Sequence, residues 1–166
     1  MSQGQGPNQK SLLYYCQQPS IDTIILSFVH IFPDQGNGWP GTNFGNQCSG
    51  AVYSGPGNNP SKNQLQSSCA NMVAAIPICQ NTYGKKIILS LGGATNTYQL
   101  TGAAKGQAFS DFLWGAFGPQ TPGWLAIRRP RPFDGPGNKA VEVDGFDFDI
   151  EHPSTGKFIL VSSTFY

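Results

Sequence analysis

The stretch from Asp144 to Glu151 reads Asp-Gly-Phe-Asp-Phe-Asp-Ile-Glu, in which apolar and acidic residues alternate. Alternate residues of a β-strand point to opposite faces, so this period of two predicts a strand. The two faces then carry different side chains: Phe146, Phe148 and Ile150 on one, and Asp147, Asp149 and Glu151 on the other. Carboxylates stacked about 7 Å apart along a strand repel one another. Such a column is expected where carboxylates do chemistry or hold a cation, with solvated acidic residues on an exposed strand as the simpler alternative.

Two more stretches predict buried strands. The run from Asp22 to Phe32 is apolar and rich in β-branched and aromatic residues, as in a strand that is covered on both faces. The run from Lys86 to Ser90 is shorter and of the same kind. Gly92 and Gly93 follow it, and glycines there permit a sharp turn and a close approach of the backbone to a ligand.

The spacing of apolar residues predicts three helices, over residues 11–17, 62–83 and 104–117. Gly84 and Gly118 are expected to end the second and the third of these helices. Pro77 predicts a kink or an early end within the second. Because strands and helices alternate along the chain, the sequence predicts a parallel α/β unit.

Two segments rich in glycine and proline, 33–60 and 119–139, predict long loops. Trp39 in the first loop is a candidate for stacking on a sugar ring, with local packing as the equal alternative, and Tyr53 is a weaker candidate. The second loop contains three arginines, Arg128, Arg129 and Arg131. They are expected to be solvated rather than to bind phosphate, because prolines lie among them and no glycine-rich phosphate loop is near.

Charge and cysteine content restrict the class of protein. The net charge of +1 gives no ground for a nucleic-acid or membrane-surface partner. There is no apolar run of about 18 residues, and the first residues lack the basic and apolar regions of a signal peptide. The 4 cysteines do not have zinc-finger spacing. Two disulfides in a secreted protein are favoured over four buried thiols in a cytosolic one, and three pairings are open.

The acidic column suits two kinds of chemistry. Desolvation and neighbouring like charges favour the protonated form of a carboxyl group, which makes Glu151 a candidate general acid. Paired carboxylates of this kind cleave glycosidic bonds. Carboxylate oxygens also bind Mg²⁺ or Ca²⁺, so the residues alone leave a metal site open. His30 lies within an apolar run and His152 points away from the acidic face, so neither is expected to be a base or a ligand.

These residues carry a resemblance to a known family. The D-x-x-D-x-D-x-E signature of the family-18 glycoside hydrolases, the chitinases, is matched by Asp144, Asp147, Asp149 and Glu151. The segment Ser90-Leu-Gly-Gly93 resembles the S-x-G-G motif of that family. Four further segments, 4–9, 25–28, 43–48 and 112–118, are similar to the fungal and plant-type class III branch. The resemblance therefore covers most of the chain, from about residue 4 to residue 152.

The resemblance implies an α/β fold that is part of a (β/α)8 TIM barrel. A complete barrel takes about 200 residues at the least, whereas this chain has 166. We therefore expect a single incomplete glycoside hydrolase catalytic domain over residues 1–166, with roughly strands two to four and their helices. The first strand and the last four strands are expected to be missing. Residues 4–9 resemble the loop after the first strand, and residues 158–166 depart from the family pattern.

The resemblance also selects a cysteine pairing and a location. Similarity to class III chitinases favours two disulfides, Cys16 with Cys79 and Cys48 with Cys69. It implies an extracellular, secreted protein, although no signal peptide is present in this chain.

The mechanism implied by the resemblance is substrate-assisted retention, in which the N-acetyl oxygen of the substrate attacks the anomeric carbon. Glu151 is implied to be the general acid and base, Asp149 to orient the acetamido group, and Asp147 to tune the charge of Asp149. Supporting roles fall to four other residues of the two motifs: Asp144, Ser90, Gly92 and Gly93. Asp144 is expected to be structural, Ser90 to hydrogen-bond the acidic column, and the glycines to provide room.

The predicted function is hydrolysis of β-1,4 linkages between N-acetylglucosamine units, impaired by the missing strands. Chitin or chito-oligosaccharides are the implied partners, no cofactor or metal is implied, and the exposed edges of a half-barrel invite self-association. One alternative is a non-catalytic, lectin-like chitin-binding protein, against which the presence of Glu151 argues. Others are an endo-β-N-acetylglucosaminidase acting on N-glycans and a non-functional gene product.

Overall fold

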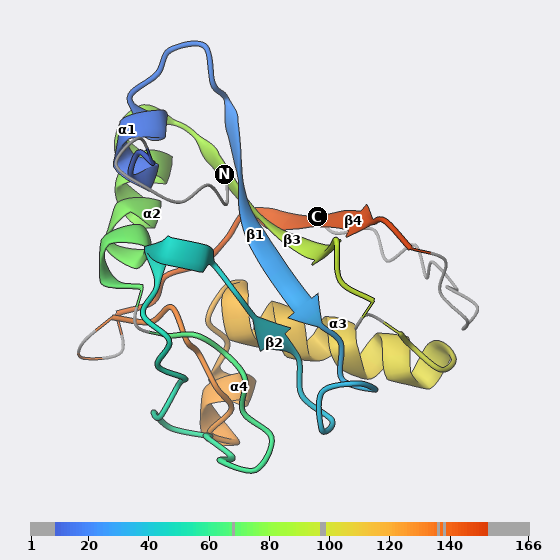
Figure 1. The fold of residues 1–166 in the computed structure, drawn as a ribbon. Coiled ribbons are helices and arrows are strands. Elements are labelled where there is room, and N and C mark those ends of the chain that lie inside the picture. Colours follow the sequence, from blue (N-terminus) through green and yellow to red (C-terminus); the bar gives the residue numbers. More distant parts are fainter. Residues whose placement is uncertain (1–8, 68, 97–98, 136, 138, 153–166) are drawn as a thin grey trace.

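The computed structural model describes residues 9–152 apart from 68, 97, 98, 136 and 138 (Figure 1). The predictions made for residues 4–8 and 158–166 lie outside this part of the chain. The described elements are, in chain order, α1 (Leu12–Cys16), β1 (Thr23–Ile31), β2 (Gly41–Thr42), a 3₁₀ turn (Gly45–Gln47), α2 (Ala70–Tyr83), β3 (Lys86–Gly93), α3 (Ala103–Phe117), α4 (Pro122–Ala126) and β4 (Gly145–Ile150).

Four strands form one sheet in the order β2-β1-β3-β4. The strands β1, β3 and β4 are parallel, and β2 pairs antiparallel to β1 at the edge. One row of the register crosses the three parallel strands, because Ser27 pairs with Ser90 and Ser90 pairs with Asp147. The prediction of a parallel α/β unit is therefore confirmed, and the three predicted strands are the three parallel ones.

A single apolar core joins the helices to one face of the sheet. Leu26 and Leu89 on the strands are fully buried, and Ile76 of α2 and Leu113 of α3 belong to the same cluster. At the end of β1 the ring of Phe32 packs on Phe109 of α3, with centroids 4.6 Å apart. Packing of the helices on the sheet sets the direction of the parallel strands. Their carboxyl ends therefore lie at the same edge of the sheet.

The second helix begins later than predicted. Leu65 continues the helical spacing in the sequence, but residues 62–67 and 69 are not helical and α2 starts at Ala70. The segment before it is extended and pairs with the preceding loop: Thr42 donates its N–H to the carbonyl of Gln64, and Tyr53 donates to that of Leu65. Tertiary pairing thus overrides the local spacing. Pro77 does not end the helix early, since α2 continues to Tyr83 and stops at Gly84, which has φ 63°.

Both predicted disulfides are present. Cys16 of α1 is bonded to Cys79 of α2, and these two helices lie side by side (Figure 1). Cys48 is bonded to Cys69, the residue before α2. The second disulfide closes the long loop that follows β1 onto the start of α2.

The second predicted loop is more ordered than its composition indicates. It contains α4, whose first turn is capped by the hydroxyl of Thr121, which accepts the N–H of Trp124. Arg131 is not solvated as predicted, because only 4% of its surface is exposed. Its guanidinium pairs with Asp134 at 2.9 Å and donates to the carbonyls of Gly115, Gly118 and Val141. Arg131 therefore joins the end of α3 to the segment that leads into β4.

Candidate active site

The acidic residues of the signature lie on β4 and just beyond it. Asp147 is opposite Ser90 in the register, and the hydroxyl of Ser90 donates a hydrogen bond to Oδ2 of Asp147 at 2.9 Å. Ser90 itself is buried, with 1% of its surface exposed. The prediction that Ser90 hydrogen-bonds the acidic column is confirmed at Asp147. Two motifs separated by more than fifty residues in the sequence thus meet on one face of the sheet.

Gly92 and Gly93 belong to β3 rather than to a turn after it, which corrects the prediction. Both glycines lie where a side chain would meet a neighbouring strand. Gly92 pairs with Asp149 at φ 116°, and a Cβ added there would lie 2.1 Å from the carbonyl oxygen of Asp149. A Cβ at Gly93 would lie 3.0 Å from the ring of Phe28 on β1. Only glycine allows β4 and its acidic side chains to approach β3 this closely.

Glu151 follows the last residue of β4 and is exposed. The next residue, His152, is also exposed, and its Nε2 lies 3.1 Å from the carbonyl oxygen of Ala94, just after β3. The carboxyl end of β4 is therefore linked to the carboxyl end of β3 by a side chain.

Asp144 lies at the opposite end of β4 and binds the start of β3. Its carboxylate accepts the N–H of Ile87 at 2.8 Å and the side-chain amide of Gln80 at 2.9 Å, and it pairs with Lys86 at 3.0 Å. Partial burial by itself raises the pKa of Asp144, but the Ile87, Gln80 and Lys86 contacts outweigh it and lower the pKa below 3.8. These contacts support the structural role expected for this residue.

Loops after β1 and β3 are also joined near the carboxyl ends of the strands. The carboxylate of Asp34 accepts the N–H and the hydroxyl of Thr101, at 2.8 and 2.6 Å, and lies 3.7 Å from the ammonium of Lys105. Thr95 donates its hydroxyl to the carbonyl of His30 at 3.0 Å. His30 is partly buried rather than a core residue, and this partial burial lowers the pKa of its imidazole. These contacts join the segment that follows β1 to the segment that follows β3.

Trp39 is placed in the core rather than at a surface. It is 8% exposed, and its ring packs on Phe112 of α3 with centroids 5.4 Å apart. This position favours local packing for Trp39 over stacking on a sugar. Tyr53 is half-buried and donates its hydroxyl to the carbonyl of Pro56 at 2.8 Å, so it too serves its own loop.

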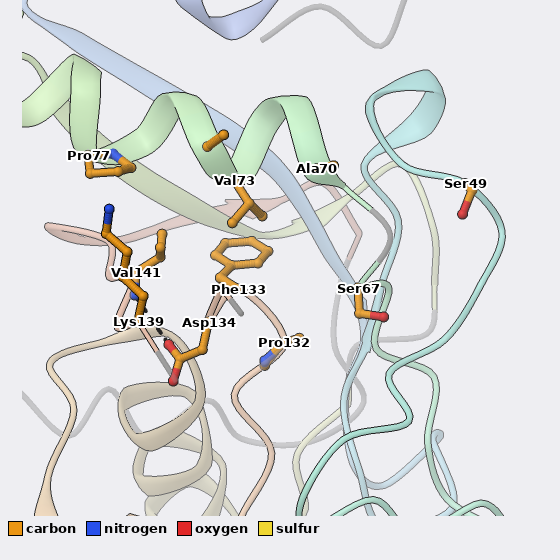
Figure 2. A pocket seen from close by; sticks show the side chains of 12 residues that line it. Ser49, Ser67, Ala70, Val73, Pro77, Pro132, Phe133, Asp134, Lys139 and Val141 are labelled. Carbon is orange, nitrogen blue, oxygen red and sulfur yellow. Dashed lines mark hydrogen bonds between the residues drawn. The ribbon is translucent and has the colours of Figure 1, made fainter. Parts of the chain in front are cut away.

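Two cavities of the described part of the chain lie away from the acidic column. One of about 750 Å³ is bordered by Val73 and Pro77 of α2 and by Phe133, Asp134 and Lys139 (Figure 2). A smaller one of about 280 Å³ lies between α3 and the apolar side of β4, where Phe148 is 56% exposed. Sequence periodicity predicted the apolar side of β4 but not this exposure. Neither of these two cavities is lined by Asp147, Asp149 or Glu151.

The described residues contain no group of three or more histidine, cysteine, aspartate or glutamate side chains that could hold a metal ion. Within the same residues, no helix has the length and apolar character needed to cross a membrane.

Comparisons with known proteins agree with the resemblance seen in the motifs. No family model matches the sequence. Endochitinase A of Aspergillus niger is 50% identical over 151 residues, which are 90% of this chain and 11% of that protein. Endochitinase A1 of Aspergillus fumigatus is 46% identical over 164 residues, which are 98% of this chain and 17% of that protein. The chain thus spans less than a fifth of the length of these relatives.

Solved structures match over a larger share of their length. A chitinase from Ipomoea carnea superposes with a TM-score of 0.62 at 29% identity, over 91% of this chain and 45% of that one. A xylanase and α-amylase inhibitor protein from Scadoxus multiflorus has a TM-score of 0.55 at 23% identity, which shows a shared fold alone. The chain is therefore a homologue of the fungal endochitinases, with a mixed α/β fold that it shares with a plant chitinase.

Proposed function

We propose that this chain carries the catalytic strand of a family-18 chitinase and that its acidic column serves to hydrolyse β-1,4 bonds between N-acetylglucosamine units. The observation that carries the proposal is the meeting of two motifs in one register. Ser90 donates to Asp147, and Gly92 lets Asp149 approach the neighbouring strand. The endochitinase relatives, which are 46–50% identical over most of this chain, supply the substrate class.

The proposed fold is part of a (β/α)8 barrel, with β1, β3 and β4 as its strands two to four. Parallel order and the coverage of 45% of the Ipomoea carnea chitinase support this assignment. In such barrels active sites lie at the carboxyl ends of the strands. Asp149 and Glu151 lie at that end of β4, whereas Asp144 lies at the other end.

In the proposed mechanism each carboxyl group has a separate role. Glu151 protonates the glycosidic oxygen as the bond breaks, while the acetamido oxygen of the substrate attacks the anomeric carbon. Asp149 accepts the acetamido N–H and stabilises the positive charge that develops on the resulting ring. Glu151 then removes a proton from the attacking water. Asp147, which accepts a hydrogen bond from Ser90, shares a proton with Asp149 and so tunes its charge and keeps it oriented.

The exposure of Glu151 has a consequence for this mechanism. A general acid near neutral pH needs an environment that favours its protonated form. The described residues leave Glu151 open, so we propose that the substrate itself completes that environment when it covers the acidic face. A bound sugar ring would exclude water from the three carboxylates and bring them under like-charge repulsion in a lower dielectric.

The proposed location is extracellular, and the two disulfides support it because such bonds persist in oxidising compartments. The proposed partner is chitin or its oligosaccharides. Self-association through β4 is a further part of the proposal, because β4 is the last strand of the described sheet and Phe148 is 56% exposed on it. No observation favours a lectin-like role or an action on N-glycans.

The test is hydrolysis of a fluorogenic chito-oligosaccharide by the purified chain and by two matched variants. Glu151→Gln removes the proposed acid, and we expect turnover to fall by about 10²- to 10⁴-fold. Glu142→Gln makes the same chemical change at an exposed carboxylate before β4 and should leave turnover intact. Equal turnover in the wild type and Glu151→Gln would refute the role of Glu151. A folded wild type without turnover would refute the catalytic function of this chain.

A further inference from the structure

The position of Glu151 depends on more than the sheet. The pairing of β4 with β3 ends at Ile150, which is opposite Gly93. Glu151 and His152 therefore follow the last pair of the ladder, and both are exposed. A residue in this position keeps its backbone direction only if something other than the ladder holds it.

His152 supplies such a contact. Its Nε2 lies 3.1 Å from the carbonyl oxygen of Ala94, the residue that follows β3. A carbonyl oxygen can only accept a hydrogen bond, so Nε2 must carry the proton in this contact. Both the neutral Nε2–H tautomer and the imidazolium meet that requirement.

The acceptor is itself held. Thr95, next to Ala94, donates its hydroxyl to the carbonyl of His30 near the end of β1 at 3.0 Å. The contact of His152 therefore reaches a segment that is tied to two parallel strands. Holding the ring of His152 restrains the peptide that joins it to Glu151, because the two residues are adjacent.

We propose that His152 is a positioning residue for Glu151. Its Nε2–H donates to the carbonyl of Ala94 and holds the backbone that carries Glu151 against the end of β3. The inference rests on the proposed role of Glu151 for its effect on turnover. Its effect on the backbone is independent of that role and can be measured separately.

The test compares His152→Gln with His152→Met. The two side chains have nearly the same length, but only the glutamine amide can donate to Ala94. Hydrogen exchange of the 145–152 segment, followed by mass spectrometry, should be about fivefold faster in His152→Met and close to wild type in His152→Gln, as expected for one hydrogen bond. On a fluorogenic chito-oligosaccharide, His152→Met should lower kcat by a similar factor with KM unchanged, and His152→Gln should restore it.

Two exchange results would overturn the proposal: exchange in His152→Met that matches the wild type, or exchange that is equally fast in both variants. A loss of turnover that glutamine does not restore would also overturn it. If the wild type has no turnover, the proposed function fails, and the exchange comparison still decides whether His152 holds this segment.

Discussion

Replacing Arg131 by methionine should destabilise the fold strongly, although the residue lies in a proline-rich loop. Its side chain is 3% exposed, and that of its partner Asp134 is 11% exposed. The change removes the ion pair at 2.9 Å and the donors to three carbonyls, those of Gly115, Gly118 and Val141. Removing one partner of a buried pair costs about 3–5 kcal/mol, because the other charge stays buried without its partner.

The assay is urea unfolding of the oxidised chain, followed by tryptophan fluorescence, with a thermal melt in parallel. The expected loss corresponds to a fall in Tm of about 6–20 °C for a domain of this size. Arg129→Met is the matched control, because Arg129 is exposed and its guanidinium only lies over Trp124, 5.6 Å from the ring centroid. The free energy of unfolding of Arg129→Met should fall by only about 0.5–1 kcal/mol. Equal losses in both variants, or a loss at Arg131 below about 1 kcal/mol, would refute the buried-pair argument.

Two further changes test the packing of the site and its surrounding loops. Gly92→Ala should cost at least about 2 kcal/mol in urea unfolding, because the new Cβ meets the carbonyl of Asp149 and φ is 116°. For Asp34, the hydroxyl of Thr101, helped by its N–H and by Lys105 against partial burial, lowers the pKa below 3.8. The stability that this carboxylate contributes is therefore complete above pH 3.8 and lost as the pH falls toward the lowered pKa. In Asp34→Asn the free energy of unfolding should therefore change less with pH in this range. The measurement is urea unfolding at a series of pH values from about 5 to about 2.

Each of these two predictions has its own control. Gly106→Ala, inside α3 with open space around the new Cβ, should stabilise the protein by about 0.5–1 kcal/mol, so a similar gain at Gly92 would contradict the close approach of β3 and β4. Asp111→Asn makes the same chemical change at an exposed carboxylate on α3 and controls for the loss of one negative charge. An unchanged profile in Asp34→Asn would show that its contacts with Thr101 do not contribute.

The elements that were predicted correctly have either a long run of residues with one periodicity or a residue such as glycine that marks where the element ends. The run before Phe32 is β-branched and apolar over its whole length, which predicted a strand, and β1 is that strand. The prediction that both of its faces are covered is wrong, because Ile24 and Leu26 are buried whereas Ile25 between them is 37% exposed. The helix that ends at Phe117 shows the spacing of a face packed on a core, and Gly118 follows it. The contact of Ser90 with Asp147 followed from two motifs that share a family, and the parallel register brings them together.

The errors come from contacts between segments far apart in the sequence. Leu65 has helical spacing, yet it is buried in an extended segment that pairs with the loop at Tyr53. Arg131 has the composition of a solvated loop around it, yet its partners are carbonyls on α3 and before β4. The two residues of β2 are too few for any periodic signal, and their pairing depends on Val29 and Ile31 of another strand. No local pattern carries such information.

The disulfide between α1 and α2 has a consequence for folding. Its sequence separation is 63, and the first register pair of β1 and β3, Thr23 with Lys86, has the same separation because each cysteine precedes its strand by an equal number of residues. In the oxidised unfolded chain, Cys16 and Cys79 therefore already hold the two strands at matching positions. When β1 pairs with β3 in the oxidised chain, the loop that must close is short, whereas in the reduced chain it is long. Closing the short loop costs less chain entropy. Because folding speed falls as contacting residues lie further apart along the chain, the oxidised protein should reach this alignment faster than the reduced one.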